Sequence, residues 1–223
     1  KEIKELAGIM KKKSKAEIQE LMDVSEDIAA LNKERYKNFK NTITPENSKP
    51  ALFTFNGDVY RNMNVRGYSG EQLDFAQEHL RILSGLYGLL RPLDLIQPYR
   101  LEMGIQLPSK KAKDLYGFWR AKITPAIDKA SKDKVVINLA SKEYFKAVDS
   151  KKLKSKVIHI TFKEDREGTY KTIGIFAKQA RGIMADYIIK NQISTPENLK
   201  LFNEEGYEFS EKMSSELNWV FIR

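Results

Sequence analysis

Apolar residues recur every three or four positions along most of the first 130 residues, which is the spacing of one face of an α-helix. The predicted helices cover residues 3–10, 14–22, 25–39, 69–80 and 115–123. Ser14 and Glu17 have the spacing of a capping box, and Ser25 and Ser69 are further helix caps. The segment 51–60 is apolar but too short and too mixed to assign to a helix or a strand.

The pattern changes after residue 130, where short apolar and β-branched runs predict strands. The predicted strands cover residues 135–139, 157–162 and 170–176, with a turn at 165–168 between the last two. A helix is predicted at 177–191, a short helix from Thr195-Pro196, and a pairing of 207–209 with 219–222. This order of elements predicts an α+β fold with a mixed or antiparallel sheet rather than regular βαβ winding.

Two glycines interrupt the apolar run of residues 80–94. We interpret this run as a helix, a tight hairpin and the start of a second element. Glycine allows positive φ angles and close approach, so such a hairpin can present backbone N–H groups to a phosphate. The candidate contacts are Ser84, Gly85, Leu86, Tyr87, Gly88 and Arg91. The alternative is that the two glycines close a helix within a packed core.

The hairpin is similar to the helix-hairpin-helix element of DNA-binding proteins, whose usual core is apolar-x-Gly-apolar-Gly. Here one extra residue, Tyr87, separates the two glycines. Arg91 lies where such elements often carry a basic residue. Because the extra residue must alter or rebuild the turn that grips phosphate, Tyr87 decides whether the hairpin binds in the usual way.

The 223 residues include 39 Lys and Arg against 30 Asp and Glu, a formal net charge of +9. This excess favours a polyanionic partner, although a solvated basic surface is an equal explanation. A hydrophobic content of 41% supports a substantial core, so we expect one domain over 1–223, helical over 1–130 and strand-rich over 131–223. No apolar run approaches the ~20 residues that cross a bilayer and no signal peptide is visible, so we expect a cytoplasmic protein without membrane contact.

Several chemical classes are excluded by composition. The absence of cysteine removes disulfides, thiolate zinc sites, iron–sulfur clusters and cysteine nucleophiles. His79 and His159 are the only histidines, and neither has a metal-ligand spacing. The standard nucleotide-binding loops and the Gly-x-Ser-x-Gly elbow are also missing. We therefore expect no metal and no cofactor.

Arg100 is a further candidate for DNA contact. It follows Tyr99 in a proline-bounded segment, and a ring beside a guanidinium suits unpaired or distorted nucleic acid, because bases stack on rings while arginines follow phosphates. The alternative is that Tyr99 packs in the core and that Arg100 pairs with Glu102.

Lys178 and Arg181 share one face of the helix predicted at 177–191, and Gly182 beside them allows close approach to a sugar–phosphate backbone. A solvated helix face is the alternative. Lysine-rich segments at 110–122 and 142–156 add to these cations. Together they predict a basic surface or cleft.

Asp58, Asn138 and Glu143 are the candidate catalytic residues of an alternative, enzymatic interpretation. Acidic and amide side chains near lysines can ligate Mg²⁺ or move protons in phosphoryl chemistry. A turn or a helix cap explains Asp58 without catalysis.

Six segments in this order and spacing resemble the bacterial YaaA family of peroxide-stress proteins. They are residues 55–60, 80–94, 97–104, 115–119, 136–141 and 177–182. The resemblance implies a cytoplasmic protein that limits damage by iron and peroxide, and a DNA-binding fold with a basic cleft and a helix-hairpin-helix element. Family members usually begin with a further strand containing a Ser-Pro-Ala-Lys-like segment, which this sequence lacks.

We therefore expect a non-enzymatic protein that contacts the phosphates of duplex or branched DNA with little base readout. An enzyme that acts on nucleic acid or a nucleotide in the same cleft is the alternative. A third interpretation, iron sequestration, requires several carboxylates and histidines to meet in space.

Overall fold

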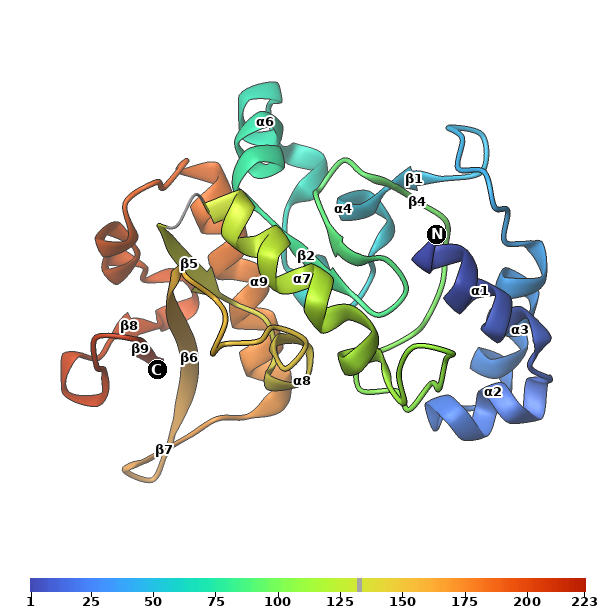
Figure 1. Cartoon of the computed structure of the whole chain (residues 1–223). Helices are drawn as coiled ribbons and strands as arrows, with labels where there is room; N and C mark the ends of the chain where they lie inside the picture. Colours follow the sequence, from blue (N-terminus) through green and yellow to red (C-terminus); the bar gives the residue numbers. More distant parts are fainter. Residues whose placement is uncertain (132–133) are drawn as a thin grey trace. The chain divides into compact units, whose positions relative to one another are not determined.

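The computed structural model describes residues 1–131 and 134–223 (Figure 1). The chain forms two compact units, each assembled from three separate stretches of sequence. Unit 1 comprises Lys1–Thr54, Arg81–Ile127 and Ser141–Leu153, and unit 2 comprises Phe55–Leu80, Asp128–Ala140 and Lys154–Arg223. The expectation of one domain over the whole chain stays a prediction beside this division.

Three helices open unit 1: α1 (Glu2–Lys12), α2 (Lys15–Met22) and α3 (Glu26–Asn38). The Ser14 hydroxyl accepts a hydrogen bond from the Glu17 N–H, and the Ser14 N–H donates to the Glu17 carboxylate at 2.7 Å. The predicted capping box is therefore confirmed, as is the cap that Ser25 provides for α3. The side chains that these helices bury include Leu6, Met10, Ile18, Ala29 and Tyr36.

Short strands and three further helices complete unit 1. They are β1 (Lys49–Pro50), α4 (Ala51–Thr54), β2 (Ile82–Ser84), β3 (Gly88–Leu90), β4 (Leu95–Ile96), α7 (Leu115–Ser131, in this unit up to Ile127) and α8 (Lys142–Phe145). Strand β1 pairs antiparallel with β4, and β2 pairs antiparallel with β3. Helix α7 buries Leu115, Phe118, Trp119 and Ile123, the residues whose spacing predicted a helix there.

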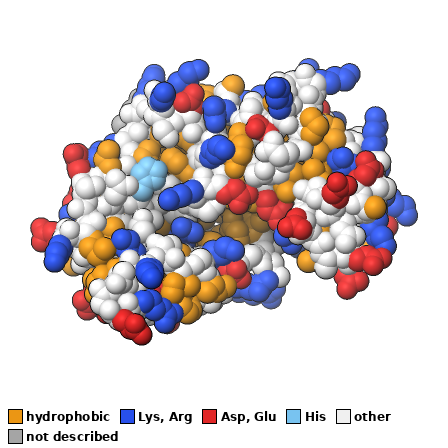
Figure 2. Space-filling view, turned by 90° about the horizontal axis from the view of Figure 1, so that it is seen from below, with side chains coloured by type: hydrophobic (Ala, Val, Ile, Leu, Met, Phe, Trp, Pro, Cys, Tyr) orange, Lys and Arg blue, Asp and Glu red, His pale blue; other side chains and the backbone are white. Residues whose placement is uncertain are grey.

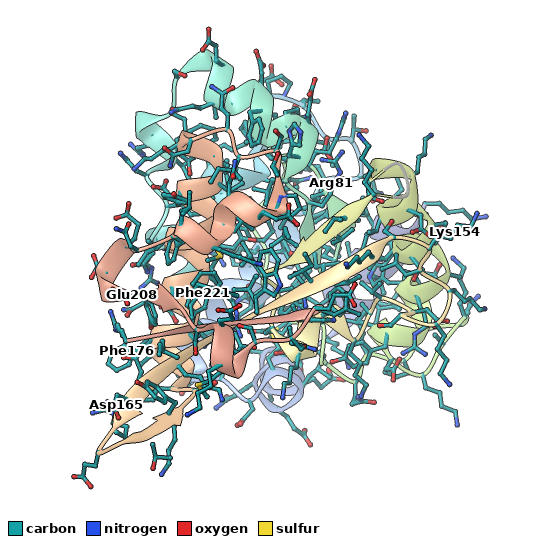
Figure 3. All side chains as sticks on the ribbon, turned by 90° about the vertical axis from the view of Figure 1, so that its left-hand side faces the viewer. Arg81, Lys154, Asp165, Phe176, Glu208 and Phe221 are labelled. Carbon is teal, nitrogen blue, oxygen red and sulfur yellow. The ribbon has the colours of Figure 1, made fainter. Side chains whose placement is uncertain are left out.

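Unit 2 contains a mixed sheet, as predicted. Its strands are β5 (Val135–Asn138), β6 (Lys156–Arg166), β7 (Thr169–Lys171), β8 (Glu208–Phe209) and β9 (Asn218–Ile222). The order is β5-β6-β9-β8, with β7 paired to β6. Strand β6 is parallel to β5 and β9, whereas β7 and β8 run antiparallel to their neighbours. Asp165, marked in Figure 3, accepts the Gly168 N–H at 2.8 Å in the predicted turn between β6 and β7.

One long helix packs on this sheet. The helices of unit 2 are α5 (Asp58–Arg61), α6 (Gly70–His79) and α9 (Gly174–Lys190), with 3₁₀ helices at Val65–Gly67, Pro196–Leu201, Glu204–Gly206 and Glu211–Met213. Ala180 and Met184 of α9 join Ile160, Phe162 and Phe221 of the sheet in one hydrophobic cluster. The core of unit 2 therefore lies between α9 and the strands, where Figure 3 marks Phe221.

The prediction of a helix-hairpin-helix element is wrong in this structure. The glycine segment lies between two strands, β2 and β3, and forms a β-hairpin. Helix α6 ends at His79 because Leu80 is extended, with φ −82° and ψ 138°. Beyond it Ile82 and Ser84 are buried while Leu83 is half-buried, which is the two-residue period of a strand.

The strand predicted at 170–176 is also wrong in its second half. Strand β7 ends at Lys171 and α9 begins at Gly174. The stripe of Ala177, Ala180 and Met184 is buried only in helical geometry, and this packing overrides the strand propensity of the residues before it. The unassigned segment 51–60 forms the short helices α4 and α5.

Candidate functional site

The predicted DNA contacts are divided between the two units. Those in unit 1 are Ser84, Gly85, Leu86, Tyr87, Gly88, Arg91 and Arg100; those in unit 2 are Lys178 and Arg181. A single basic cleft formed by all of them stays a prediction. We therefore describe the residues of each unit separately.

The positive charge of the chain is concentrated in one unit. Unit 1 contains 23 Lys and Arg against 14 Asp and Glu, a net charge of +9, whereas unit 2 contains 16 of each and is neutral. Figure 2 shows Lys and Arg side chains over much of the drawn face, with Asp and Glu among them. Attraction of a polyanion by net charge is therefore expected of unit 1 and not of unit 2.

The two glycines of the hairpin lie where other groups come very close. A Cβ on Gly85 would lie 2.2 Å from the carbonyl oxygen of Leu101, and one on Gly88 would lie 2.7 Å from the Trp119 ring. Gly88 also has a φ of +79°. The Trp119 Nε1–H donates to the Gly85 carbonyl at 2.8 Å. Both positions therefore require glycine for packing against α7 and the segment that contains Leu101.

Tyr87, the extra residue between the glycines, anchors the turn in the core. Its N–H donates to the Ser84 hydroxyl at 2.8 Å, and its phenol oxygen accepts the Gln97 N–H at 2.9 Å. Burial raises the pKa of Tyr87 to about 12. Leu86 beside it is fully buried. The turn residues are therefore bonded and buried within unit 1, in a β-hairpin rather than the turn of a helix-hairpin-helix element.

The segment 97–104 runs beside the hairpin and carries Tyr99 and Arg100. The Tyr99 phenol oxygen lies 2.6 Å from the Ser84 hydroxyl, and its ring meets the Tyr87 ring edge-on with 5.4 Å between centroids. Arg100 forms an ion pair with Glu102 at 2.7 Å and its side chain is 41% exposed. Tyr99 thus packs and Arg100 pairs with Glu102, as the alternative interpretation expected, and the Arg100 side chain is partly exposed although its Nε is buried.

Glu143, a candidate catalytic residue, is attached to the same segment. Its carboxylate accepts the Gly104 N–H at 2.9 Å, which joins α8 to the end of 97–104. The next residue, Tyr144, has a raised pKa, first because of burial and then because of the negative charges of Glu102 and Glu143. These contacts give Glu143 a positioning role in unit 1.

Arg91 lies at the base of the hairpin, directly after β3. Its guanidinium donates to one carboxylate oxygen of Asp94 at 3.0 and 3.2 Å, and its backbone N–H donates to the other at 2.8 Å. The Asp94 carbonyl in turn accepts the Ala51 N–H at 2.9 Å. Arg91 is therefore oriented by a bonded turn, although its side chain is 57% exposed.

In unit 2 the residues Lys178 and Arg181 lie on α9 beside α5. A Cβ on Gly182 would lie 2.1 Å from the Val59 carbonyl oxygen, so the two helices touch at backbone distance. The Lys178 amine lies 3.9 Å from the Asp58 carboxylate, and burial lowers the pKa of the Arg181 guanidinium. The structure thus joins the segments 55–60 and 177–182, with Asp58 as a partner of Lys178.

Asn138, the third catalytic candidate, bonds within unit 2. Its side-chain oxygen accepts the Ala140 N–H at 2.9 Å, so its amide nitrogen is the donor that lies 2.9 Å from His159 Nδ1. Burial lowers the pKa of His159, in keeping with a neutral ring that accepts this bond. Over residues 1–131 and 134–223, no three His, Asp or Glu side chains are grouped as a metal site requires. Asp58, Asn138 and Glu143 are divided between the units, and each has a bonding partner of its own.

Sequence reasoning left Trp119 and Gln97 out of the candidate site. The Trp119 indole N–H donates a hydrogen bond to the Gly85 carbonyl, 34 positions away, and the Gln97 backbone N–H donates to the Tyr87 phenol oxygen. No spacing or periodicity links such distant residues. The only available signal was that both lie in segments that carried the family resemblance.

Comparison with known proteins confirms the family resemblance of the sequence. The family model described as peroxide stress protein YaaA matches residues 1–213. A UPF0246 protein of Acaryochloris marina is 53% identical over 212 residues, which cover 94% of this chain and 84% of that protein. UPF0246 proteins of Alteromonas mediterranea and Legionella pneumophila are 49% and 50% identical, over 94% and 98% of this chain and 82% and 87% of their own lengths.

None of the helices in the described part of the chain combines the length and apolar character that crossing a membrane demands. The family match extends over all of unit 1 and over unit 2 as far as residue 213, and it includes every candidate residue described above. The chain belongs to the YaaA family of peroxide stress proteins.

Proposed function

We propose that this chain is a cytoplasmic DNA-binding protein of the peroxide-stress response, which limits damage by iron and peroxide and binds the DNA backbone. Membership of the peroxide stress family supports the physiological part of this proposal. The single observation that supports the DNA part is the distribution of charge: the whole excess of +9 belongs to unit 1, which also contains the hairpin. A surface of this sign attracts a phosphate backbone whatever its sequence.

Within unit 1, Arg91 and Arg100 are the proposed phosphate contacts. The side chains of Arg91 and Arg100 are 57% and 41% exposed, and each is paired with one carboxylate of the chain. The Nε of Arg100 is buried, so its terminal nitrogens are the proposed contact atoms. Ion pairs at the surface contribute little free energy, so a phosphate can replace either carboxylate at small cost. The turn from Ser84 to Gly88 is buried, so the proposed contacts are the arginines and not the turn residues themselves.

Lys178 and Arg181 are proposed as weaker contacts, because they belong to the neutral unit. Lys178 is 57% exposed and its carboxylate partner Asp58 is 3.9 Å away, at the limit of an ion pair. We therefore expect most of the affinity to come from unit 1.

The test is the salt dependence of binding to duplex and four-way junction DNA. Arg91→Ala with Arg100→Ala is expected to weaken binding by roughly tenfold or more and to lower the slope of log K against log salt by about 1.8, because two phosphate contacts are lost at about 0.9 each. Lys12→Ala with Lys37→Ala is the matched control, because it removes the same charge from exposed positions of unit 1 on α1 and α3. Binding that salt does not weaken, or equal losses in both double variants, would overturn the proposed site.

A further inference from the structure

One arginine of unit 2 is partly buried and has no bonding partner within the described part of the chain. The Nε atom of Arg181 on α9 is buried, and no described residue accepts a hydrogen bond from it. The ion pairs that α9 forms among the described residues are Lys178 with Asp58 and Lys190 with Asp186, and neither includes Arg181. Buried arginines are almost always paired, because removing an uncompensated charge from water is costly. Arg181 is therefore expected to bind an anion.

Helix α9 itself offers Arg181 no negative charge. Residues three or four positions apart are neighbours on a helix surface. The neighbours of Arg181 in this sense are Ala177, Lys178, Met184 and Ala185. Asp186 lies farther along α9, and its carboxylate already accepts hydrogen bonds from Asn64 and Tyr68, both at 2.7 Å. The one charged neighbour on the helix is thus a second cation, which raises the need for an anion.

Arg223, which also belongs to unit 2, shows the usual arrangement of a partly buried arginine. Its Nε–H donates to the Glu164 carboxylate at 2.9 Å, and its guanidinium lies 4.5 Å from the centroid of the Tyr207 ring. The hydrogen bond with Glu164 is the first cause that raises the pKa of Arg223, whereas burial lowers the pKa of Arg181. Unit 2 therefore compensates the charge of Arg223 with a carboxylate and does not do so for Arg181.

The backbone around Arg181 is positioned by α5. A Cβ on the next residue, Gly182, would lie 2.1 Å from the Val59 carbonyl oxygen, so the two helices touch through their backbones. The Asp58 carboxylate of α5 lies 3.9 Å from the Lys178 amine, and the Lys178 side chain is 57% exposed. Two cations and one carboxylate leave a net charge of +1 at this junction. The junction of α5 and α9 thus carries two placed cations that one carboxylate compensates only in part.

We propose that Arg181 and Lys178 together bind one phosphoryl group, with Arg181 as its principal contact. A guanidinium donates two parallel hydrogen bonds to phosphate oxygens, and an ammonium adds a compact charge, so the pair suits a tetrahedral group whose oxygens point in several directions. Unit 2 then has a phosphate site of its own, in addition to the contacts proposed for unit 1. The choice of a phosphoryl group rests on the proposed function, but the unpartnered arginine does not.

The first experiment titrates the unmodified protein with inorganic phosphate and follows the arginine Nε–H signals by NMR. The Arg181 signal is expected to shift until it saturates, because its guanidinium gains an anionic partner. Arg166, an exposed arginine of β6, is the internal control and is expected to shift less. An Arg181 signal that does not shift, or that follows Arg166 without saturating, would overturn the proposal. This measurement needs no DNA, so it separates the site from the proposed function.

The second experiment compares Arg181→Met with Arg223→Met by urea unfolding, with and without phosphate at equal ionic strength. Without phosphate, Arg181→Met is expected to be at least as stable as the unmodified protein, because an apolar side chain replaces an unpaired charge. Arg223→Met is expected to lose stability, because it leaves Glu164 without its partner. Phosphate is expected to stabilise Arg181→Met less than the other two proteins. Equal stabilisation by phosphate, or a loss in Arg181→Met as large as that in Arg223→Met, would overturn the proposal.

The source of the phosphoryl group is distinguished with Arg181→Lys and with duplexes that have or lack a 5′-phosphate. Lysine keeps the charge but cannot bind phosphate in bidentate fashion, so Arg181→Lys is expected to bind both duplexes about threefold more weakly, which assigns the DNA backbone. A loss confined to the phosphorylated duplex assigns a terminal phosphate, and unchanged DNA binding with a saturating Arg181 response assigns a small phosphorylated molecule.

The two proposals fail separately. Unchanged DNA binding of Arg181→Lys, together with an Arg181 signal that does not respond to phosphate, would overturn this inference and leave the proposed function standing. A saturating response of Arg181 in a protein that does not bind DNA at low salt would overturn the proposed function and leave this site standing.

Discussion

The two units use the same packing device but differ completely in charge. In unit 1 the hairpin touches the segment around Leu101 through Gly85, and in unit 2 helix α9 touches α5 through Gly182, both at backbone distance. Unit 1 carries the whole net charge of the chain, whereas unit 2 is neutral. The comparison teaches that Gly85 and Gly182, which lie in segments that carried the family resemblance, allow close packing of the backbone. Net charge, and not these glycines, indicates which unit would attract a polyanion.

The largest effect is expected when these glycines are filled. Gly85→Ala and Gly182→Ala would place a Cβ 2.2 and 2.1 Å from a carbonyl oxygen, so each is expected to lower the free energy of unfolding by about 3 kcal/mol or more. Urea unfolding measures this loss. Gly8→Ala in α1 is the control, since nothing lies within 4 Å of its Cβ position, and it is expected to be neutral or stabilising. If only one of these two variants lost much free energy of unfolding, the two glycines would not have the same packing role in the two units.

A smaller effect is expected from Tyr87→Phe in unit 1. Removing the phenol oxygen leaves the Gln97 N–H without its acceptor, at a cost of about 1–3 kcal/mol at pH 8. The folded-state pKa of Tyr87 is raised from 10.0 to about 12, so the unfolded chain ionises first as the pH rises. The stabilisation is therefore fully present below pH 10 and is lost as the pH approaches 12.

Urea unfolding at pH 8 and pH 11 checks both parts of this expectation. The difference in stability between Tyr87→Phe and the unmodified protein is expected to shrink at the higher pH, because phenylalanine cannot ionise. A difference in stability that is the same at both pH values would mean that folding does not raise the pKa of the Tyr87 hydroxyl.

The smallest effect is expected from Lys178→Ala in unit 2. Its ion pair with Asp58 is long and exposed, so stability should change by less than about 0.5 kcal/mol. DNA affinity is expected to fall by at most about threefold, since at most one phosphate contact is lost. Fluorescence anisotropy with duplex DNA measures the change. If Lys178→Ala lowered DNA affinity as much as the Arg91 and Arg100 double variant, unit 1 would not be the main source of the affinity.

Local patterns predicted much of the fold. Caps and helical spacing predicted α1, α2 and α3, and short apolar and β-branched runs predicted β5, the core of β6 and the pairing of β8 with β9. The glycine hairpin was misjudged because its strands are only three residues long, too short for alternation to outweigh the helical pattern before them. Its partners Trp119 and Leu101 are distant in sequence, and no local propensity encodes such contacts.

The candidate site was predicted less completely than the fold. Arg91 and Arg100 were recognised from residue type and position, but their carboxylate partners decide how accessible each charge is. The antiparallel pairing of β2 with β3 could not be predicted, because the helical interpretation of this segment contains no strand register.

The interleaving of the units has a consequence for how the chain is made. The sequence passes from one unit to the other five times, and unit 1 receives its last stretch at Ser141–Leu153. During synthesis from the N-terminus, the segment 97–104 lacks its Glu143 partner until roughly two thirds of the chain has been made. Because contacts between distant residues must wait for loop closure, the basic surface of this protein should be completed late, after much of the chain has left the ribosome.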